Sequence, residues 1–185
     1  MKEAPIILRL VSSGAGLARY ARLMTVSSPA RRSPAEQQRL EAALADLFEQ
    51  RITFNQVLGM KVVSLAPGLP TSRFDMRPEL VGHYLYGRLH GGVISSVLDA
   101  MGGLALMVAI GEKHADESTA QVMHRFGRMG TIDLRVDFLR QGLGQHFLAT
   151  AEVTRLGGRV GSTQMRLTNQ DGLLIATAAA AYIVS

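Results

Sequence analysis

The first regular pattern of apolar positions along the chain begins just after residue 33. Ser33-Pro34-Ala35-Glu36 has the form of a capping box, with proline at the first helical position. The apolar residues that follow are spaced three or four apart: Leu40, Ala43, Leu44, Leu47 and Phe48. This spacing predicts a helix from 34 to 50 with one apolar face. Two strands and two irregular connections are expected next: strands Phe54–Val63 and Ser72–Met76, turn Leu65–Pro70 and the irregular segment Pro78–Arg88.

Between His90 and Ile110 the apolar residues cover nearly the whole circumference of a helix. A helix of this kind is buried, either in a protein core or in a membrane. In a membrane Asp99 would lie near the middle of the bilayer, at a cost of about 3 kcal/mol, and two serines and two glycines weaken the span further. We therefore expect a buried core helix and no integral membrane span.

After this helix the pattern changes to the alternation of a strand. Ile132, Leu134, Val136 and Phe138 alternate with Asp133, Arg135 and Asp137, which predicts a half-buried strand. Three further strands are separated by glycine-rich turns: Phe147–Thr154, Val160–Thr168 and Leu173–Val184. Because short turns join antiparallel neighbours, we predict that these four strands are consecutive neighbours in one sheet.

The last strand carries small residues at Ala176 and Ala178–Ala181, which would let a helix lie close to the sheet. The segment His114–Gly130 is polar and is expected to be a surface excursion. The predicted fold is α+β, with an antiparallel sheet wrapped around one long central helix and with a further helix at its N-terminal side. We place this domain at 33–185.

Charge separates the domain from what precedes it. The chain has a net charge of +5, but residues 1–35 hold six basic residues and one acid, which leaves 14 basic and 14 acidic residues in the remainder. The basicity therefore belongs to an extension at 1–32. Three interpretations of this extension remain open: an amphipathic arm, an organelle-targeting peptide, or a start placed too early, with Met24 nearer the true beginning. A secretory signal does not fit, since Arg9 interrupts its short apolar run.

Composition excludes several classes of function. The chain has no cysteine, so disulfides, thiolate metal sites and a cysteine nucleophile are ruled out, and a cytoplasmic location is expected. Without tryptophan, and with 5% aromatic residues, it offers little for stacking nucleic-acid bases. The five histidines show no metal-ligand spacing, and no serine lies in a nucleophile elbow. We expect no metal, no bound cofactor and no nucleic-acid partner.

The candidate chemistry lies at the central helix. His90-Gly91-Gly92 stands at its start, where free N–H groups and a partial positive charge can form an oxyanion hole. Asp99 is the one charged residue between His90 and Ile110, and burial of a carboxylate is costly unless something compensates. About 12 Å of helix separates Gly91 from Asp99. If both act on one substrate, a second copy of the helix must lie antiparallel beside the first, so we predict a homodimer with composite sites.

Less specific interpretations remain open. His-Gly-Gly alone is a weak motif, and a lone buried aspartate is often a structural hydrogen-bonding or ion-pairing group. Asp133, Arg135 and Asp137 fit a solvated face with mutual pairing. His124 and His146 are expected at the surface.

The residues resemble those of a known family. Leu89-His90-Gly91-Gly92-Val93-Ile94 followed by Leu98-Asp99 is similar to the signature of PaaI-type hot-dog thioesterases, and within them to the YigI-like acyl-CoA thioesterases. The resemblance covers residues 35–185. It extends to three further segments: Phe54-Asn55 with Leu58-Gly59-Met60, Arg128–Asp137, and Ala176-Thr177-Ala178 with Tyr182.

The resemblance implies a hot-dog fold and hydrolysis of acyl-CoA thioesters of medium to long chain, by a homodimer or a dimer of dimers. Asp99 would act as general base on water or as nucleophile, the Gly91 N–H would polarise the thioester carbonyl, and His90 would hold the turn. Thr131 would orient the water and Gly92 would lie against the substrate.

Other implications concern substrate binding. Arg155 and Arg159 flank Gly157-Gly158 and could meet the CoA phosphates, although a solvated turn explains them equally well. Relatives carry an asparagine six or seven residues before the histidine, where this chain has Tyr84 and His83; His83 could donate the missing hydrogen bond. Two alternative functions are a non-catalytic acyl-CoA sensor on the same fold and a dehydratase that uses His90 with Asp99.

Overall fold

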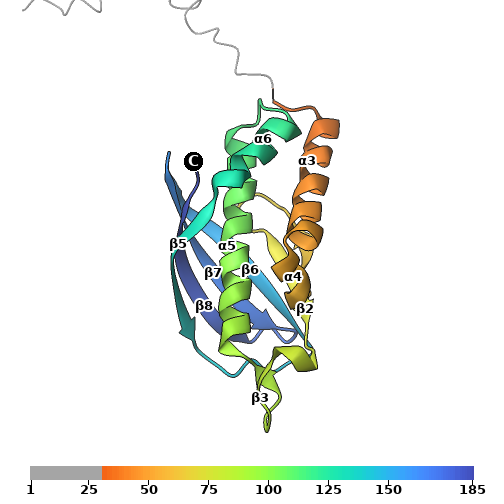
Figure 1. The fold of residues 1–185 in the computed structure, drawn as a ribbon, viewed down its shortest axis with the longest axis vertical. Coiled ribbons are helices and arrows are strands. Elements are labelled where there is room, and N and C mark those ends of the chain that lie inside the picture. The colour runs from red at the N-terminus through yellow and green to blue at the C-terminus, as the bar shows by residue number, and fades with distance from the viewer. Residues whose placement is uncertain (1–30) are drawn as a thin grey trace, which may run out of the picture. The chain divides into compact units, whose positions relative to one another are not determined.

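The structure, a computed structural model, describes residues 31–185 (Figure 1). Residues 1–30 of the basic extension, which its three interpretations concern, lie outside this range. The helical elements are α3 (Pro34–Asp46), the π-helical turn η1 (Leu47–Arg51), α4 (Thr53–Leu58), the 3-10 turn η2 (Pro78–Leu80), α5 (Gly91–Lys113), α6 (Thr119–Arg125) and the 3-10 turn η3 (Phe126–Arg128). The strands are β1 (Lys61–Ser64), β2 (Thr71–Asp75), β3 (Val81–His83), β4 (Arg88–Leu89), β5 (Gly130–Phe138), β6 (His146–Leu156), β7 (Val160–Asn169) and β8 (Leu174–Ile183).

Helix α5 lies between the sheet and the helices α3 and α4 (Figure 1). Six strands form one antiparallel sheet in the order β1-β2-β6-β7-β8-β5, and β3 and β4 form a separate hairpin. The side chains of α5 that are fully buried are those of Val97, Leu98, Met101, Leu104 and Leu106. This helix is long and apolar enough to cross a membrane, but more than half of it is buried within the fold. It is the predicted core helix, and the architecture is the predicted hot-dog fold.

The small residues of β8 let α5 approach the sheet, as predicted. Ala176, Ala178 and Ala180 are buried on the helix side of the strand. At Gly102 the contact is closest, because an added Cβ would lie 2.2 Å from the Tyr182 hydroxyl and 2.8 Å from that of Thr163. Any larger residue at Gly102 would push the helix away from the sheet.

The strand predicted over Phe54–Val63 is wrong in its first half. Residues Thr53–Leu58 form α4, and only Lys61–Ser64 is a strand. Gly59 ends the helix in the left-handed conformation, with φ 72°, and its N–H bonds back to the carbonyls of Asn55 and Gln56. Aromatic and branched residues favoured a strand here, whereas the glycine is a helix C-cap.

The segment His114–Gly130 is not an irregular excursion. A capping box of Ser118 and Gln121 starts α6, and Val122 and Phe126 are buried against Leu40 of α3 and Ile110 of α5. Spacing of four residues places these two apolar side chains on one helical face. Pro78–Arg88 is likewise more regular than predicted, since it holds η2, β3 and part of β4.

The predicted neighbour of β5 is also wrong. β6, β7 and β8 form the expected meander, but β5 pairs with β8 at the edge of the sheet rather than with β6. The connection after β5 crosses the end of the sheet: Leu139 and Arg140 donate to Ile175 at 3.0 Å, and the Gln145 carbonyl accepts from Met76 at 2.8 Å. As an edge strand, β5 leaves its side chains more exposed than a central strand would, and Ile132 is 53% exposed.

Arg32 fixes the end of α5 from outside the helix. Its guanidinium donates to the carbonyls of Gly111 and His114, both at 2.6 Å, and of Glu117 at 3.2 Å. A cation at a helix C-terminus satisfies carbonyls that have no partner within the helix and complements the negative end of its dipole. This last residue of the basic extension therefore contacts the folded domain.

Candidate active site

The Asp99 side chain is half-buried and lies on the wall of a cavity of 270 Å³. The cavity is bounded by α5, by η1 with α4, and by the start of β5. Its volume lies just below the range of small-molecule sites, about 300–1,000 Å³. The carboxylate therefore faces a space that a ligand can enter and is not enclosed by packed side chains.

Thr131 holds this carboxylate from the neighbouring strand. Its hydroxyl donates a hydrogen bond to Asp99 Oδ1 at 2.9 Å. Simple alternation would put Thr131 on the outer face of β5 with Asp133. The pairing with β8 shifts register between these two residues, a bulge that turns Thr131 to the inner face opposite Tyr182.

A second contact fixes the backbone at the same point. The Tyr182 hydroxyl, on β8, donates to the Asp99 carbonyl at 2.9 Å. Burial raises the pKa of the Tyr182 phenol well above its ordinary value, and the negative charge of Asp99 raises it further. The phenol is thus protonated at neutral pH and donates this hydrogen bond.

The start of α5 leaves one glycine amide free. His90 is the N-cap, and its Nδ1 accepts from the Gly92 N–H at 2.9 Å. An added Cβ at Gly92 would lie 2.9 Å from the same imidazole nitrogen, so this cap requires glycine there. Among residues 31–185 the Gly91 N–H has no hydrogen-bond partner. Of the two glycines, Gly91 alone can offer its amide to a substrate.

The β3–β4 hairpin places His83 and Tyr84 beyond the start of α5. Tyr84 at its tip is 87% exposed, and the His83 ring stacks on it with centroids 5.6 Å apart. The buried Nδ1 of His83 has no hydrogen-bond partner within the described part of the chain. The base of the hairpin packs so tightly that a Cβ on Gly82 would lie 2.4 Å from the His90 Cα.

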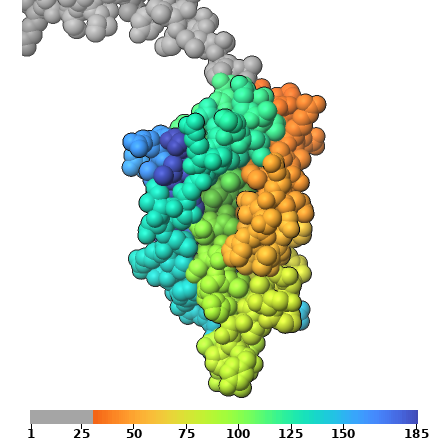
Figure 2. Space-filling view, viewed as in Figure 1, coloured from red at the N-terminus to blue at the C-terminus, as the bar shows by residue number. Residues whose placement is uncertain are grey.

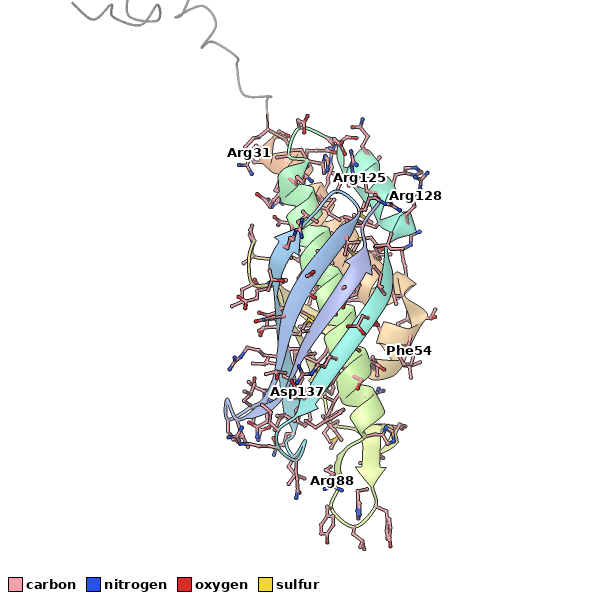
Figure 3. The ribbon with its side chains drawn as sticks, turned by 90° about the vertical axis from the view of Figure 1, so that its left-hand side faces the viewer. Arg31, Phe54, Arg88, Arg125, Arg128 and Asp137 are labelled. Atoms are coloured by element: carbon pink, nitrogen blue, oxygen red, sulfur yellow. The ribbon has the colours of Figure 1, made fainter. Side chains whose placement is uncertain are left out.

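Arg155 and Arg159 do not line the Asp99 cavity. Both are exposed at the β6–β7 turn, and neither has an ion-pair partner within residues 31–185. The turn residues Gly157 and Gly158 line a second, polar cavity of 740 Å³, together with Lys113, Arg125 and Arg128. Arg125 and Arg128 lie at the end of the molecule opposite the hairpin of Arg88 (Figure 3). Along α5, about 21 Å separates Asp99 from Lys113.

Arg135, Asp137 and His124 fit the non-catalytic interpretations, whereas His146 is less exposed than predicted. Arg135 and Asp137 pair at 3.0 Å on the outer face of β5, as expected for a solvated face. His124 is exposed and His146 half-buried. Within the described residues no group of three His, Cys, Asp or Glu side chains is placed to hold a metal.

Tyr182, Asn55 and Ser96 are polar residues that line the Asp99 cavity and were not predicted as site residues. Tyr182 and Asn55 both belong to segments that carry the family resemblance, but no periodicity pointed to them. Asn55 is 3% exposed, and its amide donates to the Phe48 carbonyl at 3.0 Å, which ties α4 to η1. Asn55 therefore helps to hold the wall opposite Asp99.

The model of the thioesterase superfamily matches residues 86–176. The medium/long-chain acyl-CoA thioesterase YigI of Salmonella typhimurium is 38% identical over 141 residues, which are 76% of this chain and 91% of that protein. The chain belongs to the thioesterase superfamily. The family resemblance seen in the sequence is thereby confirmed.

Solved structures of thioesterase-superfamily proteins agree in fold. A structure from Shewanella oneidensis, related to the superfamily, is 34% identical and superposes with a TM-score of 0.77, covering 83% of this chain and 100% of its own. Thioesterase superfamily member 2 of Mus musculus is 20% identical, with a TM-score of 0.61 over 83% of this chain and 100% of its own. At that identity the likeness concerns the fold alone.

Proposed function

We propose that this thioesterase-superfamily chain hydrolyses acyl-CoA thioesters of medium to long chain to the free acid and CoA. The observation that carries the proposal is the Asp99 carboxylate, which faces a cavity and accepts a hydrogen bond from Thr131. The identity of 38% to a medium/long-chain acyl-CoA thioesterase supports the substrate class. Together they favour hydrolysis over binding alone.

The proposed reaction needs a base, a water molecule and a polarised carbonyl. Asp99 takes a proton from water as the water oxygen attacks the thioester carbon, the C–S bond breaks, and the proton passes to the leaving thiolate. In the alternative route Asp99 attacks the carbon itself, the C–S bond breaks, and the CoA thiolate leaves and takes a proton from solvent. Water then hydrolyses the resulting anhydride, which releases the free acid and regenerates Asp99. Thr131, which donates to one carboxylate oxygen, leaves the other free in both routes.

The free amide of Gly91 would polarise the thioester carbonyl of the substrate. It cannot act on the same carbonyl as the Asp99 of its own helix. The two residues are eight positions apart on α5, about 12 Å along the axis. We propose that two copies pair with their α5 helices antiparallel, so that Gly91 of one protomer meets Asp99 of the other. The edge strand β5 supports this arrangement, since its Ile132 and Phe138 are 53% and 55% exposed. A dimer of dimers is a further proposed assembly.

Recognition of the CoA moiety is assigned to the β6–β7 turn of the partner protomer, whose α5 runs in the opposite direction. Arg155 and Arg159 are exposed cations that would bind its phosphate groups. Gly92 shapes the start of α5, and His83 with Tyr84 would border the thioester carbonyl. The proposed chemistry requires no metal and no bound cofactor. A cytoplasmic location, where acyl-CoA is made and used, is part of the same proposal.

Release of CoA is the test. The purified chain is mixed with decanoyl-CoA or palmitoyl-CoA, and free thiol is followed with a thiol reagent. We expect steady turnover that stops when the substrate is exhausted. Saturable binding of acyl-CoA without thiol release would contradict the proposal and would favour a sensor, and loss of water from a hydroxyacyl-CoA would favour a dehydratase.

A further inference from the structure

The cavity beside Asp99 continues along α5 toward the C-terminal end of that helix. Past the carboxylate, the lining residues of α5 are Ala100, Gly103, Leu104 and Met107, all without polar side-chain atoms except the thioether. Met107 lies eight residues beyond Asp99, about 12 Å along the helix axis. The cavity is thus polar at the carboxylate and apolar along the helix beyond it.

The opposite wall is also apolar and is open to the surface. It is formed by Phe48 of η1, Phe54 of α4 and Ile52 between these two elements, and Phe54 is 55% exposed. Gly103 and Met107 are half-buried, whereas most of α5 around them is fully buried. In the space-filling view α5 is visible at the floor of a hollow between α4 and β5 (Figure 2). We call this open, apolar part of the cavity the Gly103 groove.

Gly103 itself gives the groove its depth. A glycine in a helix interior is unfavourable compared with alanine, so its presence calls for a reason. The neighbouring Gly102 has one, because it packs against Tyr182 and Thr163. At Gly103 an added Cβ would meet no atom within 4 Å, so close packing does not require a glycine. What its missing side chain provides is space in the groove.

We infer that the acyl chain of the substrate lies in the Gly103 groove, from Asp99 toward Met107, and that Gly103 determines which chain lengths are accepted. This inference rests on the proposed acyl-CoA hydrolysis. A thioester carbonyl at Asp99 has its acyl chain on one side and its CoA on the other. The apolar groove suits the chain, because each methylene that leaves water is stabilised by burial against Phe48, Phe54 and Met107.

Replacement of Gly103 by leucine tests the inference. The new side chain would fill the groove while the helix gains propensity, and the site around Asp99 would stay in place. We expect kcat/KM to fall about tenfold or more for decanoyl-CoA and palmitoyl-CoA, since several buried methylenes lose their contacts, and to change far less for butyryl-CoA. Gly103→Ala should give a smaller loss with the same dependence on chain length.

Gly127→Leu is the matched control. Gly127 lies in η3, outside the groove, and also has no atom within 4 Å of an added Cβ. It should leave the chain-length profile unchanged. Equal losses for all three substrates in both Gly103 variants, or no loss in either, would overturn the inference while leaving the proposed hydrolysis intact. A wild-type protein that releases no CoA from any substrate would instead overturn the proposed function.

Discussion

The hydroxyl of Tyr182 and the backbone carbonyl of Asp99 are joined by a hydrogen bond of 2.9 Å, between the last strand and the middle of the core helix. Thr131, whose hydroxyl bonds to the Asp99 side chain, lies directly opposite Tyr182 on the neighbouring strand. Two adjacent strands therefore hold one helical residue, one by its side chain and the other by its backbone.

Removal of the phenol oxygen should loosen this attachment. We expect Tyr182→Phe to lower kcat several-fold with little change in KM, because the ring still fills its place while Asp99 loses a positional restraint. The expected cost in unfolding free energy is about 1 kcal/mol, the usual net value of a buried hydrogen bond. Steady-state kinetics with denaturant unfolding checks both. Equal loss of stability with unchanged kcat would show that the bond is structural only.

The same tyrosine should make folding sensitive to alkaline pH. Its pKa is raised in the folded protein above the ordinary value of 10.0, because it is buried and near Asp99. Above pH 10 the unfolded chain releases this proton while the folded chain keeps it, so the stabilisation present below pH 10 is lost as pH rises. The slope is at most about 1.4 kcal/mol per pH unit. Denaturant unfolding from pH 8 to pH 11 should show this slope as the difference between wild type and Tyr182→Phe; identical profiles would contradict it.

Thr131→Val removes a hydroxyl and keeps the shape of the side chain. We expect kcat to fall about tenfold or more, because Asp99 loses the group that orients it, and a branched residue still suits the strand. Thr131→Ser keeps the hydroxyl and should retain most activity. The rate of CoA release from decanoyl-CoA distinguishes the two variants. A valine variant as active as the serine variant would exclude a role for this hydrogen bond.

The free amide of Gly91 can be removed with little disturbance. Proline is well tolerated at the first position of a helix, and His90 before it has φ −67° and ψ 141°, which a following proline requires. Gly91→Pro should therefore lose most turnover, whereas Gly91→Ala, which keeps the N–H, should not. The measurement is kcat for each variant, with thermal unfolding to show that both fold.

Co-expression of Gly91→Pro with Asp99→Asn tests whether sites are shared between protomers. In a two-fold dimer with composite sites, each mixed dimer regains one intact site, so random pairing restores about a quarter of wild-type activity. A site built within one chain would regain nothing. Failure of the mixture to exceed either variant alone would contradict the composite site.

The central helix and its carboxylate were predictable because both depend on local pattern. Apolar residues on every side of α5 required burial, and an aspartate among them stood out. The α4 helix was not predicted, since aromatic and branched residues at Phe54 and Val57 resemble a strand and the deciding feature is the left-handed Gly59. The pairing of β5 with β8 depends on a connection that crosses the sheet, and the sequence of the strands does not encode that choice.

The site was predictable only in part for the same reason. Alternation in β5 places Thr131 on the outer face, and the bulge that turns it toward Asp99 is a property of the pairing with β8. Tyr182 reaches Asp99 from 83 residues away because Gly102 lets helix and sheet come close. Such contacts arise from packing between distant segments. Family resemblance pointed to Thr131, and periodicity did not.

Asp99→Asn is the most direct measurement of the proposed chemistry. The amide keeps the size of the side chain and its contact with Thr131 but cannot act as a base, so we predict that hydrolysis of decanoyl-CoA falls about 100-fold or more while folding and acyl-CoA binding persist. Asp133→Asn, an exposed acid two residues past Thr131, should hydrolyse at the wild-type rate. An Asp99→Asn protein that releases CoA as fast as the wild type would contradict the assignment of Asp99 as the catalytic carboxylate.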